Sequence, residues 1–436
     1  MDNSSAGADR MPKFIEHDRS DDGVDRRGFL RCMAWTGTGI LWTLSGGVPK
    51  SFALGKLGEL TETQQKSLFF AQISDSHIGF NKAANQDVTA TLQAAVDKLN
   101  LLPQTPAFVL HTGDISQLSK AEEFDTADQV LRGIKTDRVF YVPGEHDVLS
   151  DNGAQYLQRY GKNAKGAGWY SFDHSGVNFI GLVNVLNLKA GGLGSLEAEQ
   201  LDWLKRDVTG LSSSTPVVIF AHIPLWSVYP QWGWGTDDSE QALSLLRRFG
   251  SVTVLNGHIH QTMQKVEGNV AFHTALSTAF PQPAPGSAPS PGPMTVDAAR
   301  LRSFLGVRHV TYVEGRGMLA TVDSTISGEP IGNFAMGQDM AMSSRKAKAP
   351  LVLAANQVGI DNFSFGPRVL TVKRGTTVTW INSDDVPHVI VSQRSTFPGS
   401  KVVDTDQRYS YRFDKAGTYE YFCAIHPTMT GTIVVK

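Results

Sequence analysis

Five short groups of Asp, His and Glu residues follow one another between residues 75 and 260. They are Asp75–His77 (DSH), Gly113–Asp114 (GD), Gly144–Asp147 (GEHD), His222 within AHIP, and Gly257–His260 (GHIH). Carboxylates and imidazoles in this mixture suit two divalent or trivalent metal ions with one bridging carboxylate. Two ions about 3.5–4 Å apart clamp a phosphoryl group and generate a hydroxide nucleophile near neutral pH. The chemistry that these residues predict is metal-activated hydrolysis of a phosphate ester.

A second and more compact group of metal-ligand residues lies near the C-terminus. Cys423, His426 and Met429 share the heptapeptide CAIHPTM, and His388 precedes them in a strand-rich segment. Two imidazoles and one thiolate in a trigonal set, with a weak axial thioether, are the ligands of a blue-copper electron-transfer site. The sequence therefore predicts one copper ion at these four residues.

Short apolar runs precede the groups of the first series. The runs are 68–73, 107–110, 139–142, 217–220 and 252–255. Runs of this length suit strands buried on both faces, and the residues that follow them would meet at one edge of a sheet. Helical spacing of Val88, Leu92, Ala95, Val96 and Leu99 between the runs indicates an α/β architecture.

The residue pattern changes from α/β to all-β after this region. Residues 281–293 (PQPAPGSAPSPGP) predict a long loop, and 307–313 and 318–322 predict further strands of the same domain. We expect a linker at 328–349 and an all-β domain at 350–436, with a hairpin formed by 369–372 and 376–381 and further strands at 417–422 and 432–435.

The first series, over about residues 67–325, resembles the calcineurin-like metallophosphoesterase superfamily. The resemblance implies an α-β-β-α sandwich and a dinuclear site of iron, manganese or zinc. It implies one metal at Asp75, His77 and His260, a bridge at Asp114, and the other metal at His222 and His258. It further implies that His146 binds phosphate or protonates the leaving alkoxide, with Asp147 orienting it.

One residue departs from the pattern of that superfamily. Its third group is normally GNH, whose Asn ligates the second metal and contacts phosphate, whereas this chain has Glu145. A carboxylate can still ligate, favours a harder or higher-valent ion, and repels the phosphate. Gln117 stands where purple acid phosphatases have a metal-binding Tyr, so we do not assign the chain to them. The AHIP and GHIH groups are closest to those of cyclic-nucleotide-type phosphodiesterases, which favours a diester substrate.

Residues 350–436 resemble the cupredoxins. The spacing in CAIHPTM is most like that of amicyanin, with two residues between Cys and His and two between His and Met. The resemblance implies an all-β cupredoxin sandwich with copper at His388, Cys423, His426 and Met429.

The first 53 residues resemble a twin-arginine export signal. Arg26 and Arg27 precede a mildly apolar run from 33 to 48, and we expect cleavage after Ala53 and a mature phosphoesterase domain at 54–327. Cys32 would leave with the signal, so the mature chain would have a single thiol, at Cys423, and no disulfide. A periplasmic or otherwise exported protein without a permanent membrane anchor is the expectation.

The net charge of the chain limits the classes of partner that it can bind. The 436 residues carry 40 basic against 42 acidic side chains, a net charge of −2, which gives no case for structural nucleic-acid binding. The expected partners are a small-molecule phosphate ester and a redox partner of the copper domain. Two interpretations of the aromatic residues at 226–234 stay open, a substrate cleft and a local packing cluster.

The leading hypothesis is an exported dinuclear phosphoesterase with a type 1 copper electron-transfer domain. The alternative is a copper-binding, electron-transfer protein whose first domain is weakly active or a scaffold. A third idea, that the copper domain exchanges electrons with an iron in the larger site, rests at this stage only on the covalent fusion.

Overall fold

The computed structural model describes residues 40–45, 48–53, 67–136, 138–313, 319–332, 334 and 352–436. The chain divides into two compact units, Met1–Glu62 and Thr63–Lys436. In the first, strands β1 (Ile40–Ser45) and β2 (Val48–Ala53) pair antiparallel. Arg26 and Arg27 of the predicted export signal, Cys32, and most of the predicted linker lie outside the described residues. Among the described residues, none belongs to a helix that is long and apolar enough to cross a membrane.

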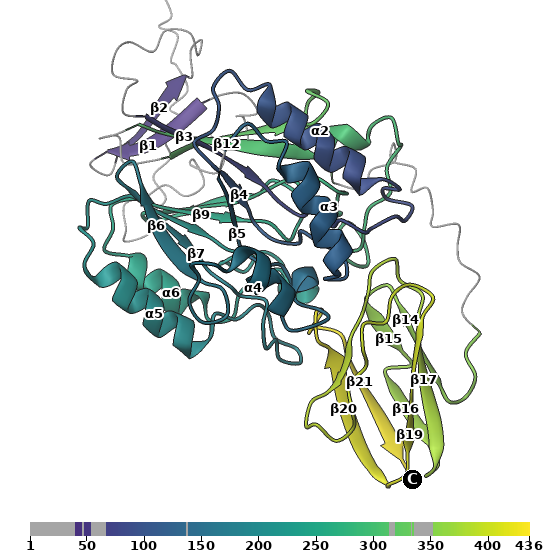
Figure 1. The fold of residues 1–436 in the computed structure, drawn as a ribbon. Coiled ribbons are helices and arrows are strands. Elements are labelled where there is room, and N and C mark those ends of the chain that lie inside the picture. The colour runs from purple at the N-terminus through teal and green to yellow at the C-terminus, as the bar shows by residue number, and fades with distance from the viewer. Residues whose placement is uncertain are drawn as a thin grey trace, which may run out of the picture. The chain divides into compact units, whose positions relative to one another are not determined.

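Two sheets form the body of residues 67–325 (Figure 1). One has the order β13 (Leu319–Thr325), β12 (Gly306–Val313), β3 (Ser67–Ile73), β4 (Val109–His111) and β5 (Val139–Tyr141). The other has the order β10 (Gln264–Glu267), β11 (Val270–Thr274), β9 (Val252–Asn256), β8 (Val217–Phe220), β7 (Val177–Gly181) and β6 (Tyr170–His174). Strands β3, β4 and β5 run parallel in the first sheet, as do β7, β8, β9 and β11 in the second.

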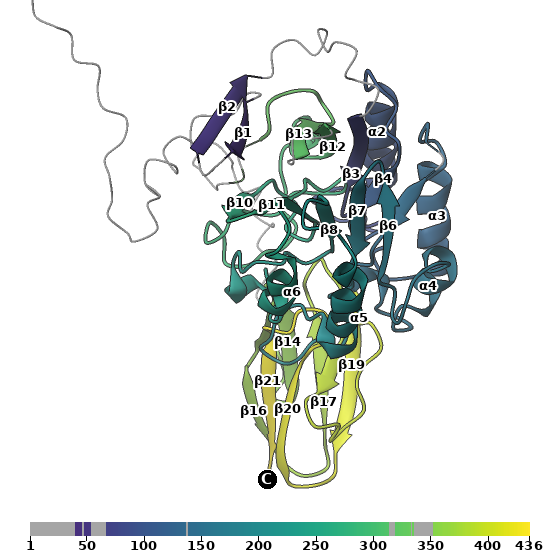
Figure 2. The same ribbon diagram turned by 90° about the vertical axis from the view of Figure 1, so that its left-hand side faces the viewer.

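Alternating side chains of these strands fill three hydrophobic layers. Leu68 and Phe70 of β3 meet Val218 and Phe220 of β8 in the layer between the sheets. The residues that alternate with them face outward, where helices cover them. Helices α2 (Val88–Asn100) and α3 (Ala121–Leu131) pack on the first sheet, and α5 (Glu197–Thr209) and α6 (Ser239–Leu246) on the second (Figure 2). The expected α-β-β-α sandwich is therefore confirmed.

The apolar runs form strands, with one difference in burial. Strands β4, β8 and β9 are buried along their whole length, as expected for central strands. Strand β5 is only half-buried, because it lies at the edge of its sheet. Residues 275–300 contain no helix or strand, which agrees with the long loop predicted at 281–293. Among the described residues, a further helix, α4 (Ala154–Tyr160), contributes Tyr156 to the core of the first sheet.

Residues 352–436 form a sandwich of two four-stranded sheets. One has the order β15 (Ser364–Gly366), β14 (Gln357–Asp361), β17 (Thr376–Asn382) and β19 (Arg408–Phe413). The other has the order β16 (Val369–Val372), β21 (Thr430–Val435), β20 (Gly417–Cys423) and β18 (Ile390–Ser392). Trp380, Tyr421 and Cys423 lie in the single core between the sheets.

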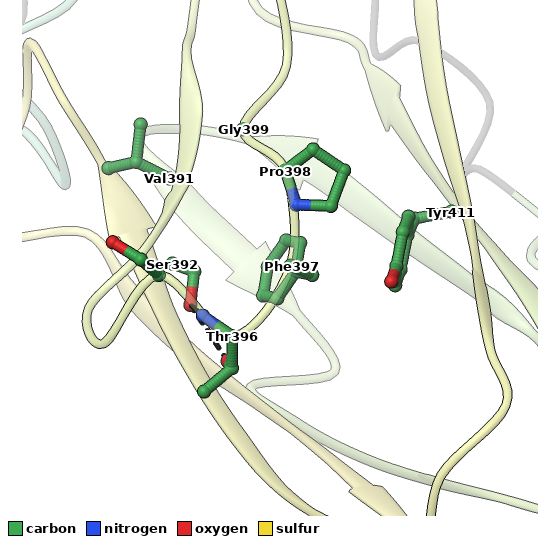
Figure 3. Close-up of a pocket in the computed structure, with 8 residues that line it drawn as sticks. Val391, Ser392, Thr396, Phe397, Pro398, Gly399 and Tyr411 are labelled. Atoms are coloured by element: carbon green, nitrogen blue, oxygen red, sulfur yellow. Dashed lines mark hydrogen bonds between the residues drawn. The ribbon is translucent and has the colours of Figure 1, made fainter.

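The predicted hairpin of 369–372 and 376–381 is wrong. Both segments are strands, but β16 pairs with β21 and β17 pairs with β14 and β19, so the chain crosses from one sheet to the other at 373–375. The two strands form where they are predicted, whereas their pairing depends on partners far away in the sequence. A pocket of about 530 Å³ on this domain is lined by residues of 391–399 and Tyr411, none of them a predicted ligand (Figure 3).

Candidate metal centres

The ends of five parallel strands deliver the residues of the larger site. Asp75 and His77 follow β3, Asp114 follows β4, and the 3₁₀ turn η2 (Glu145–Asp147) follows β5. In the other sheet, His222 follows β8, and His258 and His260 follow β9. Because carboxyl ends of parallel strands meet at one edge, the predicted residues converge.

One cluster joins Asp75, His77 and His260, whose potential ligand atoms lie within 4.8 Å of one another. Asp75 Oδ1 lies 3.3 Å from His260 Nε2, and the Nε2 atoms of His77 and His260 are 3.2 Å apart. Asp114 Oδ2 lies 3.4 Å from His77 Nε2. This is the set expected for the first metal.

A second cluster joins Glu145, His222 and His258. The two oxygens of Glu145 lie 3.0 Å from His222 Nε2 and 2.9 Å from His258 Nδ1. Asp114 Oδ2, which faces the first cluster, is also 3.3 Å from His222 Nε2. One carboxylate oxygen therefore faces both clusters, as a bridging ligand would, and Glu145 takes the place expected for the superfamily's Asn.

Hydrogen bonds on the far side of three imidazoles orient them toward the clusters. Nδ1 of His77 is 2.9 Å from the Gln117 side-chain oxygen, Nδ1 of His260 is 2.6 Å from the Phe280 carbonyl, and Nδ1 of His222 is 2.7 Å from the Thr112 carbonyl. Each contact places an N–H on Nδ1 and leaves Nε2 with a lone pair when the ring is neutral.

Unpaired atoms indicate that these clusters need a cation. His222 Nε2 and Glu145 Oε2 are buried and lie 3.0 Å apart, yet among the described residues neither has a partner in hydrogen-bond geometry. Two imidazole nitrogens with lone pairs, those of His77 and His260, also face each other across 3.2 Å. Such an arrangement is costly unless a positive charge lies between the atoms. The donor set fits two metal ions.

The carboxylates and imidazoles of the site shift one another's pKa. Burial raises the pKa of Glu145, but His258 and His222 outweigh this and hold it well below its usual value. Burial lowers the pKa of His222, yet Asp114 and Glu145 hold it well above its usual value. Burial lowers the pKa of His77 to about 3. In the absence of metal, His222 therefore retains a proton, which a bound ion would displace.

Five predicted ligands have a left-handed backbone. The φ angles are 54° at Asp75, 42° at His77, 52° at Asp114, 70° at His258 and 53° at His260. This conformation is uncommon for residues other than glycine and clusters at functional sites.

Close approach of the loops explains two glycines of the sequence groups. A Cβ at Gly144 would collide with the Asp114 carboxylate, and a Cβ at Gly257 would collide with the Ser74 hydroxyl. The G in GEHD and in GHIH is therefore needed because other residues of the site lie against the backbone there.

His146 lies beside the first cluster, but Asp147 does not orient it. The His146 ring packs edge-on against His77, with centroids 4.8 Å apart. Its Nδ1 is 2.8 Å from the Gln117 carbonyl, so this carbonyl and not Asp147 sets the ring. The Asp147 carboxylate instead accepts hydrogen bonds from the N–H groups of Ile115, Ser116 and Gly144. The predicted role of Asp147 is therefore corrected to bracing the η2 turn.

Electrostatics favour a protonated His146. Burial lowers its pKa, but the carboxylates of Asp114 and Glu145 more than compensate and raise it above the usual value. Since the Gln117 carbonyl holds Nδ1–H, Nε2 is the atom that can give up a proton to a bound molecule.

The aromatic residues after His222 form a packing cluster in part. Trp226 and Trp234 are buried, and Trp226 packs against Phe272 of the core. Trp232 contacts both Tyr229 and Trp234 edge-on. Packing explains the two buried tryptophans, whereas Tyr229 and Trp232 are half-buried.

The copper candidates converge at one end of the second sandwich. Cys423 Sγ lies 3.6 Å from His388 Nδ1 and 3.7 Å from His426 Nδ1, and the two Nδ1 atoms are 3.3 Å apart. Met429 is buried in the same core, and its backbone N–H donates to the His426 carbonyl, which closes the loop tightly. The three strong donors form the trigonal set that type 1 copper requires.

Neighbouring groups favour the metal-binding forms of the copper-ligand candidates. Burial raises the pKa of the Cys423 thiol, but His388 and His426 hold it well below its usual value. Burial lowers the pKa of His388, whereas Asp384 and Cys423 raise it to about 9. Asp384 Oδ2 lies 2.9 Å from His388 Nε2, so a buried carboxylate fixes the ring with Nδ1 toward the site.

Two of the residues that orient ligands were not found from the sequence. Gln117 holds both His77 and His146, and Asp384 holds His388. The sequence offers one weak signal, because Asp384 precedes His388 by four residues in a loop. The carbonyls of Thr112 and Phe280 leave no signal, since any residue supplies a carbonyl.

Comparison with known proteins divides the chain in the same way. Residues 70–262 match the model of the calcineurin-like phosphoesterases, and residues 352–436 match that of the copper binding proteins of the plastocyanin/azurin family. Amicyanin of Paracoccus versutus is 34% identical over 95 residues, which are 21% of this chain and 71% of that protein. A 3',5'-cyclic-nucleotide phosphodiesterase of Nostoc sp. is 26% identical over 220 residues, which are 48% of this chain and 78% of that protein. An Arcobacter nitrofigilis protein named "Probable glycerophosphodiester phosphodiesterase" is 24% identical over 235 residues, with the same coverage of 48% and 78%.

Proposed function

We propose that this chain is an exported phosphodiesterase with a two-metal site and a type 1 copper electron-transfer domain. The proposal builds on the match of residues 70–262 to the model of the calcineurin-like phosphoesterases and on the membership of residues 352–436 in the plastocyanin/azurin family of copper binding proteins.

The position of Asp114 carries the hydrolase part of this proposal. Its Oδ2 faces His77 of one cluster and His222 of the other, at 3.4 Å and 3.3 Å. Seven side chains are assigned to the two ions, namely Asp75, His77, Asp114, Glu145, His222, His258 and His260. When bound, such a pair of ions supplies Lewis acidity for the phosphoryl group and a nucleophile from water.

His146 supplies the proton. It lies next to His77 and, through its backbone N–H, next to Asp114 Oδ1 at 3.0 Å. The neighbouring carboxylates of Asp114 and Glu145 raise its pKa, which favours the protonated ring, and its Nε2 is free of the Gln117 contact. His146 Nε2 therefore protonates the departing alkoxide, which is the step that general acids accelerate.

Charge favours a diester over a monoester as the substrate. Glu145 adds a negative charge at the second cluster, where the superfamily has a neutral Asn. A diester carries one negative charge near neutral pH and a monoester about two, so Glu145 repels the monoester more strongly. Two of the relatives described above are named as phosphodiesterases, which agrees with this choice.

Asp114→Ala tests the hydrolase assignment against the alternative of a copper protein with an inactive scaffold. Loss of the shared oxygen should abolish hydrolysis of bis(p-nitrophenyl) phosphate while leaving the visible copper absorption intact. The matched control is Asp202→Ala, because Asp202 is exposed on α5. Retained hydrolysis in Asp114→Ala, or cleavage of p-nitrophenyl phosphate but not of the diester by the unchanged protein, would refute the proposal.

Export by the twin-arginine route is tested separately. Replacing Arg26 and Arg27 together by Lys should keep the protein in the cytoplasm, whereas Arg31→Lys should not. N-terminal sequencing of the exported protein should begin at Leu54. Export that is unaffected by the double replacement would refute this route and leave the enzymatic proposal unaffected.

A further inference from the structure

One of the four copper-ligand candidates is not fully covered by the copper domain. Three of the candidates are at most 3% exposed, namely His388, Cys423 and Met429. His426, in contrast, is only partly buried. Its ring packs edge-on against Phe363 of the same domain, with centroids 4.8 Å apart. His426 is therefore the ligand through which an electron can enter or leave the copper site.

The phosphoesterase domain lies against this loop. The N–H of Gly191 donates to the carbonyl of Pro427, the neighbour of His426, at 2.6 Å. Leu149, just after the η2 turn, packs against the hydrophobic core of the copper domain. The Ser290 hydroxyl donates a hydrogen bond to the side-chain oxygen of Asn362 at 2.5 Å. Three separate segments thus contact the copper domain.

His146 lies between the two metal centres. Its ring centroid is 6.5 Å from that of His426, in an edge-on arrangement, and 4.8 Å from that of His77. His77 Nε2 faces the first metal cluster. The imidazoles of His426, His146 and His77 therefore form a continuous series from one predicted metal site to the other, through contacts that do not depend on the covalent linker.

We propose that His146 is an electron relay between the copper bound at His426 and an iron ion bound at His77. One electron leaves cuprous copper, which becomes cupric, and reduces ferric iron to ferrous iron, or passes in the reverse direction. No covalent bond forms or breaks. The copper exchanges its electron in turn with a one-electron carrier from solution. This inference rests on the proposed function, because it needs a metal at the first cluster. In this arrangement the copper domain sets the oxidation state of that metal.

The test measures electron transfer between the two metal sites directly. Full-length protein with copper in its C-terminal domain and iron in the dinuclear site receives one electron from a flash-generated radical, or loses one from the fully reduced state. In one of these two experiments the visible copper absorption should relax after the flash at a rate independent of protein concentration. Freeze-quench Mössbauer spectra should record the matching change in iron valence. Zinc in place of iron should remove the relaxation, because zinc has no redox chemistry.

Three variants separate the relay from general damage. His146→Ala opens a gap between His426 and His77 and should slow the relaxation by at least an order of magnitude. Leu149→Arg should slow it by separating the domains, with an unchanged copper spectrum. His174→Ala is the matched control, because His174 lies on β6 and contacts Phe108 instead. Metal content and the copper spectrum are measured for each variant, so that a misfolded protein is recognised.

The outcomes distinguish the relay from the enzyme. The relay is refuted by any of three results. Iron is bound but the copper absorption relaxes in neither experiment, the relaxation rate depends on protein concentration, or His146→Ala relaxes at the same rate as the unchanged protein. Hydrolysis of bis(p-nitrophenyl) phosphate by the zinc-loaded protein would then still support the proposed function. If the dinuclear site binds no iron, manganese or zinc, both proposals fail.

Discussion

Glu145→Asn should shift the substrate preference toward monoesters. The oxygens of Glu145 lie 2.9–3.0 Å from ring nitrogens of His258 and His222, so a phosphoryl group bound to the same metal would lie close to this carboxylate. At about 5 Å and an effective dielectric constant of about 20, one additional unit of like charge costs roughly 3 kcal/mol. Screening by the metal ions reduces this penalty, which leaves about 1–2 kcal/mol, or roughly tenfold, as the expected change. Asn can still ligate through its carbonyl oxygen.

The assay compares kcat/KM for p-nitrophenyl phosphate and bis(p-nitrophenyl) phosphate at neutral pH. The ratio of monoester to diester should increase about tenfold in Glu145→Asn. Glu122→Asn, at an exposed position of α3, should leave the ratio unchanged. Metal content is measured in parallel, because loss of one ion would lower both activities together. An unchanged ratio with both ions present, or a shift toward the diester, would refute the charge argument.

Three further predictions concern metal binding. Gly257→Ala should prevent loading of the dinuclear site, since its Cβ would collide with Ser74, whereas Gly210→Ala, where a Cβ meets nothing within 4 Å, should load normally in elemental analysis. Cys423→Ser should remove the intense visible copper absorption but retain hydrolysis by the zinc-loaded protein; an intact absorption would contradict the copper assignment. Copper affinity, measured by chelator competition, should rise by about tenfold per pH unit and level off near pH 9, because copper must displace the proton that the raised pKa keeps on His388 below that pH; a flat profile would contradict this.

The convergence of the candidate residues could be predicted where it depends on their positions after apolar runs. Asp75, His222 and His260 each follow an apolar run, and buried parallel strands bring such positions together whatever the details of packing. The copper loop is local, so Cys423 and His426 could be placed from spacing alone.

Features that depend on distant pairing were harder to predict. The strands 369–372 and 376–381 were found, but nothing local indicates that they join opposite sheets. Asp147 was expected to orient its neighbour His146, yet the turn directs its carboxylate to the N–H groups of Ile115 and Ser116, which lie 32 and 31 residues earlier in the chain. The contact of His146 with His426 joins two domains, and no pattern within either one encodes it.

The left-handed backbone of five ligands sets a limit on how heat-resistant the functional protein can be. A non-glycine residue in this conformation costs on the order of 1 kcal/mol, and five of them amount to a sizeable fraction of the roughly 5–15 kcal/mol that keeps a domain folded. Glycine at Asp75 or His258 would relieve part of this cost and raise the melting temperature of the metal-free protein, while removing a ligand. Selection for thermal stability alone would therefore erode the dinuclear site first, so thermostable variants of this enzyme are better sought away from its strand ends.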